Sequence, residues 1–79
     1  MKTTRIALYK ILRKMGIKRQ EICATASLKS DLSFDAQDLN LFFYFLEGRF
    51  NIFINNEEEQ AIQTVNDAID YIDSRVVLN

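Results

Sequence analysis

Few side chains in this 79-residue sequence could perform covalent chemistry. There is no histidine and one cysteine, Cys23, so neither a Cys/His zinc site nor a Cys–His nucleophile pair can be assembled. No activating base stands beside Cys23, and we interpret it as an ordinary loop or core residue. The carboxylates of Glu57, Glu58 and Glu59 are more typical of a solvated helix start than of acid–base catalysis. The sequence therefore predicts that the chain is not an enzyme.

The segment DLSFDAQDL (31–39) has the clearest local pattern. Asp35 and Asp38 stand three residues apart, which is the spacing of a capping pair, and a long apolar run follows them. Between the two aspartates lie Ala36 and Gln37, and the alanine has no reactive group. The pattern predicts a helix that begins at Ala36 with an inert side chain in its first position.

Helical periodicity of the apolar residues predicts the elements that carry this turn. We expect helices over residues 3–15, 36–49 and 57–61, and a last one that begins at Thr64 and extends its apolar stripe to Val76. Gly16 ends the first helix, because glycine readily takes a left-handed conformation. The expected core is the set of stripe residues Leu8, Ile11, Leu12, Met15, Leu39, Phe42, Phe43, Leu46, Phe50, Val65, Ile69 and Ile72.

Residues 17–34 show no sustained period and predict a long ordered loop pinned by scattered apolar residues. With 48% apolar residues, two glycines and no proline, the chain is expected to be a single all-α domain over residues 1–79. It has no apolar run of about 18 residues, and we expect a monomeric cytoplasmic protein.

The small net charge of −1 conceals an uneven distribution. Residues 1–20 contain seven basic residues and no acidic one, whereas residues 21–79 contain eleven acidic and three basic residues. This asymmetry indicates either internal charge complementarity or a basic face for an acidic partner.

The order of helix, long loop, helix, short helix and final helix resembles the acyl carrier protein family. In residues 15–35 the resemblance rests on Gly16, Ile17, Glu21, Ile22, Ser27, Asp31 and Leu32. In residues 38–72 it rests on Leu46, Glu47, Phe50, Ile54, Glu57, Glu58, Ile62, Thr64, Val65, Ala68, Ile69, Tyr71 and Ile72. The resemblance implies a four-helix bundle with a short third helix, and a role in fatty acid or polyketide-type synthesis.

In that family, a serine at the start of the second helix carries 4'-phosphopantetheine. The matching triplet here is Asp35-Ala36-Gln37, and a methyl group cannot form a phosphodiester. Three explanations are open: a carrier-like protein that has lost its arm, a laboratory substitution at position 36, or attachment at Ser33. The unusual Gln37 favours the first, because removal of the serine alone would not alter its neighbour.

The resemblance also implies protein partners that bind the second helix. Asp35, Asp38 and Glu47 would retain part of the family's acidic surface. The exposed face of this helix is expected to present Leu41, Tyr44 and Phe45 to a partner through apolar contact, with burial of Phe45 or Leu41 as the alternative. A less favoured hypothesis is that the basic first helix binds nucleic acid or an anionic surface.

Overall fold

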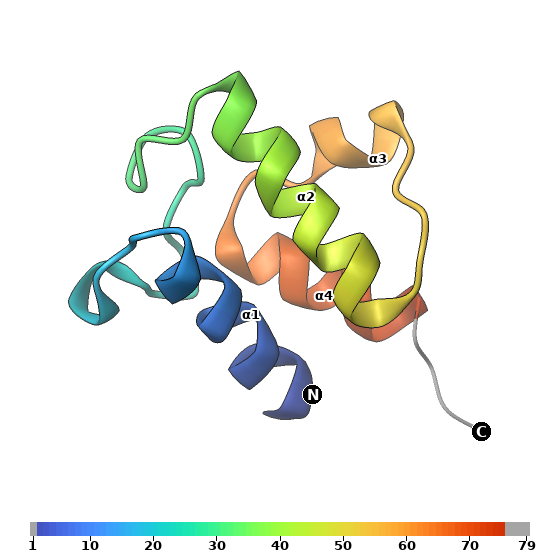
Figure 1. Ribbon diagram of the computed structural model, residues 1–79, viewed down its shortest axis with the longest axis horizontal. Helices are drawn as coiled ribbons and strands as arrows, with labels where there is room; N and C mark the ends of the chain where they lie inside the picture. The colour runs from blue at the N-terminus through green and yellow to red at the C-terminus, as the bar shows by residue number, and fades with distance from the viewer. Residues whose placement is uncertain (1, 76–79) are drawn as a thin grey trace.

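The computed structural model describes residues 2–75 and consists of four packed helices with a long connection after the first (Figure 1). The helices are α1 (Lys2–Lys14), α2 (Ala36–Phe50), α3 (Asn56–Ala61) and α4 (Val65–Arg75), and a turn of 3-10 helix, η1, covers Arg19–Glu21. Residues 2–75 contain no β-strand, and none of their helices is long and apolar enough to cross a membrane. The all-α prediction is confirmed, whereas Val76 lies outside the described residues.

Reciprocal hydrogen bonds define the starts of α2, α3 and α4. In each case a capping residue and the residue three positions later accept one another's backbone N–H: Asp35 with Asp38, Asn55 with Glu58, and Thr64 with Asp67. Such a cap stabilises a helix by about 1 kcal/mol. After α1, Gly16 has φ +97°, the left-handed conformation that the sequence predicts for this stop.

The core lies where α1, α2 and α4 meet. Leu8, Leu12, Phe42, Leu46 and Ile72 are completely buried there. Aromatic contacts extend the core towards the loop, since the Phe42 ring lies 5.9 Å from that of Phe34 and 5.4 Å from that of Phe43.

Three residues expected in the core are only partly buried and pack against its edge: Met15, Leu39 and Phe50. They lie at the edge of the core rather than at its centre because of their positions along the chain. Met15 follows the last residue of α1, Phe50 ends α2, and Leu39 stands in the first turn of α2, where no neighbouring helix covers the whole side chain.

The loop after α1 contributes four buried apolar side chains to the core that the helices form. Ala26, Leu28, Leu32 and Phe34 are all at least 93% buried. The backbone N–H of Leu28 donates to the Gln63 carbonyl at 2.9 Å, and that of Val65 donates to the Ala26 carbonyl at 3.0 Å. These bonds flank an antiparallel bridge between Ser27 and Thr64, so the loop is joined directly to the start of α4.

Arg75, at the end of α4, binds both α3 and the segment that precedes α3, and we call this set of contacts the Arg75 clamp. Its guanidinium donates to Glu58 Oε2 and to Tyr71 Oη, each at 2.7 Å, and to the Phe53 carbonyl at 3.2 Å. The pKa of Glu58 is lowered, chiefly because its carboxylate accepts the Asn55 backbone N–H, and further by Tyr71 and Arg75. The pKa of Tyr71 is raised, mainly by burial and then by its hydrogen bond to Glu58.

Leu28 is 1% exposed. We therefore expect Leu28→Ala to destabilise the protein as much as the same substitution at a buried helix position. The lost transfer free energy and the resulting cavity should lower the free energy of unfolding by about 2–5 kcal/mol. Urea denaturation followed by circular dichroism measures this change. Ile17→Ala, at a half-buried loop position, is the control and should cost less. If both substitutions cost little, the loop does not belong to the core.

The clamp predicts a pH-dependent contribution of Glu58 to stability. Since the folded-state pKa of Glu58 lies below its unfolded value, its contribution is complete above the unfolded pKa and disappears as the pH falls through the folded pKa. The wild type should therefore exceed Glu58→Gln in stability at neutral pH, and the two should converge in acid. Urea denaturation at several pH values measures the difference. Glu57→Gln, which alters a neighbouring carboxylate outside the clamp, should show a smaller effect at neutral pH.

Candidate functional site

The first turn of α2 has the shape that the sequence predicts, with Ala36 at its first position. Asp35 lies in extended backbone, and its carboxylate accepts the Asp38 N–H at 2.8 Å. Ala36 is exposed, and the buried Phe34 ring anchors the turn to the core from the other side. The turn therefore presents the side chain at position 36 to solvent from a rigid support.

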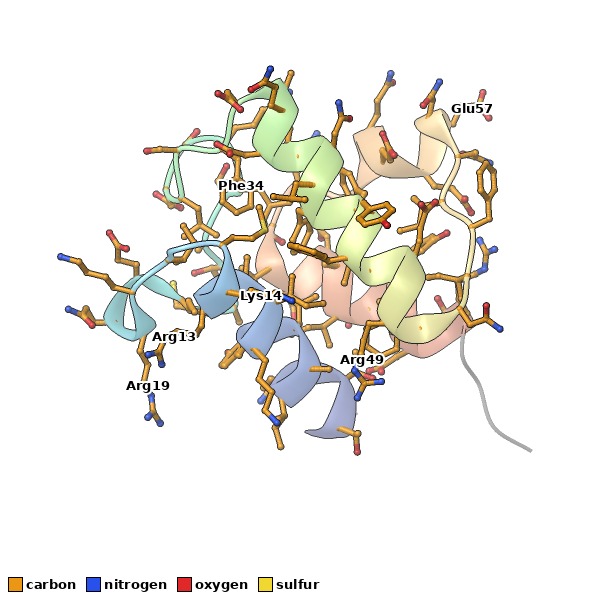
Figure 2. The ribbon with its side chains drawn as sticks, viewed as in Figure 1. Arg13, Lys14, Arg19, Phe34, Arg49 and Glu57 are labelled. Carbon is orange, nitrogen blue, oxygen red and sulfur yellow. The ribbon has the colours of Figure 1, made fainter. Side chains whose placement is uncertain are left out.

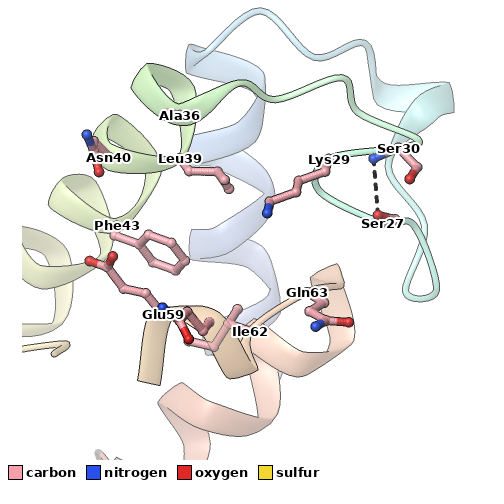
Figure 3. A pocket seen from close by; sticks show the side chains of 11 residues that line it. Ser27, Lys29, Ser30, Ala36, Leu39, Asn40, Phe43, Glu59, Ile62 and Gln63 are labelled. Carbon is pink, nitrogen blue, oxygen red and sulfur yellow. Dashed lines mark hydrogen bonds between the residues drawn. The ribbon is translucent and has the colours of Figure 1, made fainter. Parts of the chain in front are cut away.

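A groove of about 660 Å³ opens beside Ala36, between α2, α3 and the loop (Figure 3). Leu39, Phe43 and Ile62 form its apolar part. Polar side chains from all three segments complete it: Ser27, Lys29, Ser30, Asn40, Glu59, Gln60 and Gln63. Phe42 and Phe43 are buried in the core of the bundle, and the groove lies at its surface, where an edge of Phe43 lines it.

A tight turn places Lys29 at this groove. Ser27 Oγ accepts the Ser30 backbone N–H at 3.1 Å, and Asp31 Oδ2 accepts the Ser27 backbone N–H at 2.7 Å. Figure 3 shows the Lys29 side chain extending from the loop into the space in front of Leu39. Sequence periodicity could not identify this lysine, because only the folded loop brings it near α2.

The residues at this turn do not fit a phosphopantetheine group. Attachment requires a hydroxyl oxygen at the first position of α2, where Ala36 has a methyl group and Gln37 follows with an exposed amide. Ser33 is exposed and has a hydroxyl, but its φ of 60° places it in a left-handed turn three residues before the helix. Asp35 supplies the cap of α2, as its spacing from Asp38 predicts. Residues 2–75 also contain no group of three or more Cys, Asp or Glu residues arranged for a metal ion.

The apolar residues proposed for partner binding fall into two groups. Tyr44 is 69% exposed and Leu41 is 44% exposed, both on the outer face of α2. Phe45 is half-buried against the core, its ring lies 6.2 Å from that of Tyr44, and Lys14 Nζ lies 5.1 Å from its centroid. Leu41 and Tyr44 are therefore accessible to a partner, whereas Phe45 packs between the core and the Tyr44 ring.

The three carboxylates proposed for the same surface have intramolecular roles. Asp35 and Asp38 cap α2, and Glu47 Oε2 accepts the Ile54 backbone N–H at 2.8 Å in a partly buried position. The Glu47 bond holds the segment after α2 against that helix. Sequence spacing indicated the capping pair but contained no signal for the contact between Glu47 and Ile54.

Comparison with known proteins identifies the fold. No family model matches the chain. Among solved structures, the chain is similar to the solution structure of a proposed acyl carrier protein from Anaplasma phagocytophilum, with a TM-score of 0.81. The two sequences are 23% identical, and the match covers 96% of this chain and 90% of the other. The chain therefore has an acyl-carrier-protein-like fold of four helices.

Proposed function

We propose that this protein is a non-catalytic, partner-binding module with the acyl carrier protein fold and without the means to carry phosphopantetheine. The observation that carries the proposal is the exposed methyl group of Ala36 at the first position of a fully capped α2. The Asp35–Asp38 capping box and the Phe34 anchor are present, so the geometry of the presenting turn is maintained. What is missing is the oxygen that would attack phosphorus.

The outer face of α2 supports a role in protein binding. Leu41 and Tyr44 expose apolar surface on a rigid helix, and tyrosine is frequent at the energetic centres of interfaces. Because Leu41 and Tyr44 expose apolar surface and Glu47 is partly buried, we expect apolar burial to contribute more than acidic steering to this contact. Enzymes of fatty acid or polyketide-type synthesis are the candidate partners suggested by the fold.

A second candidate function is that of an ordinary carrier in which the serine at position 36 has been replaced. The groove beside Ala36 favours it, because Leu39, Phe43 and Ile62 offer an apolar surface next to the attachment position. In that case 4'-phosphopantetheine would be the cofactor of the serine form only. The first experiment below separates this candidate from attachment at Ser33.

Intact-mass analysis after incubation with coenzyme A and a broad-specificity phosphopantetheinyl transferase tests the proposal. We expect no mass gain for this chain, because position 36 lacks a nucleophile, and a gain for Ala36→Ser if the transferase recognises the turn. Ala36→Ser combined with Ser33→Ala is the matched control and should gain the same mass. A gain in the unaltered chain that Ser33→Ala abolishes would contradict the proposal.

The partner surface predicts the effect of the double substitution Leu41→Glu, Tyr44→Ala. The affinity for a protein partner isolated with the wild-type chain should weaken at least about tenfold. This corresponds to about 1.4 kcal/mol of binding free energy, which side chains at the centre of an interface commonly contribute. Calorimetric titration measures the affinity, and circular dichroism checks the fold. Phe53→Ala, which removes an aromatic side chain that is 70% exposed outside α2, is the control and should bind normally. Full binding by the folded double variant would exclude this surface.

A further inference from the structure

Residues of α1 and of the η1 turn line a second recess of about 430 Å³. Figure 1 shows α1 and the segment after it away from the start of α2. The lining residues of the recess are Ile6, Tyr9, Lys10, Arg13, Arg19 and Ile22. None of them lines the groove beside Ala36. The recess is therefore separate from the site described above.

The floor of this recess is apolar. Ile6 is 49% exposed, and Tyr9 and Ile22 are half-buried and pack against the core. Ile6 and Tyr9 stand three residues apart on α1 and therefore share one face of that helix. A partner that covered this floor would remove apolar surface from water, at about 25 cal/mol per Å².

The rim of the recess is basic. Lys10 and Arg13 come from α1 and Arg19 from η1, and Figure 2 shows Arg13 and Arg19 together at one edge of the molecule. In residues 2–75 no ion pair joins any of these three cations to a carboxylate, and the nearby Glu21 accepts the Lys18 backbone N–H at 3.1 Å. Like charges held beside one recess repel each other and favour an anionic ligand.

We infer that this recess is a docking site for an acidic segment of a partner protein, in which a bulky apolar side chain is flanked by carboxylates. The apolar side chain would cover Ile6 and Ile22, and the carboxylates would pair with Arg13 and Arg19. Tyrosine and arginine, both present here, are enriched at the centres of protein interfaces. A planar bilayer does not fill a recess, and nucleic acid phosphates gain nothing from an apolar floor, so a protein segment fits both features best.

The probe for this site is a synthetic peptide with one phenylalanine flanked by glutamates, titrated into the ¹⁵N-labelled chain. We expect amide shifts at Ile6, Tyr9, Arg19 and Ile22, and weaker binding at higher salt. Replacing the peptide's glutamates by glutamine, or its phenylalanine by alanine, should each reduce the affinity at least about fivefold.

Matched variants of the chain locate the contact. Arg13→Glu and Arg19→Glu should each weaken peptide binding at least about fivefold, whereas Arg49→Glu makes the same charge change at the end of α2 and should leave the affinity within about twofold. The double variant Leu41→Glu, Tyr44→Ala should bind the peptide with normal affinity. This result separates the inference about the recess from the proposed function of the α2 surface.

Four results would overturn the inference. The first is an absence of peptide binding, and the second is a loss of peptide affinity with Arg49→Glu as large as that with Arg13→Glu. The third is binding of the chain to phosphatidylserine vesicles but not to the peptide. The fourth is self-association of the chain that Arg13→Glu abolishes. The last two would assign the recess to a membrane surface or to a second copy.

Discussion

The contact between the loop after α1 and the start of α4 determines how the rest of the molecule is arranged. Two backbone hydrogen bonds, from Leu28 to Gln63 and from Val65 to Ala26, satisfy polar groups that the buried loop would otherwise leave unpaired. Because these groups are paired, Leu28 and Phe34 can enter the core between the helices. The loop thereby becomes a wall of the groove and a support for the first turn of α2.

That support explains why the architecture does not depend on the side chain at position 36. The Asp35–Asp38 capping box and the buried Phe34 hold the turn, and neither involves the side chain at position 36. An exposed serine and an exposed alanine at this position differ little in what they contribute to folding. The stability of the fold is therefore independent of the residue that the turn presents at position 36.

The charge asymmetry of the sequence corresponds to a separation in space. Figure 2 shows Arg13 and Arg19 at one edge of the molecule and Glu57 near the opposite edge. Asp35 caps α2, and Glu58 helps to cap α3 and binds Arg75, whereas no ion pair within residues 2–75 involves the cations of the α1 recess. Within residues 2–75, the recess combines three cations that join no ion pair with the exposed apolar side chain of Ile6.

The amino-acid sequence by itself determined the four helices, the capping pair of α2, the glycine stop and the absence of a hydroxyl at position 36. These features depend on residues within about one helical turn of each other, so local spacing is sufficient. The tertiary structure decided that the loop is core, that Phe45 is half-buried, that Glu47 binds Ile54, and that α1 and η1 enclose a recess. Each of these depends on how segments pack in three dimensions, and the spacing of residues along the chain does not specify that packing.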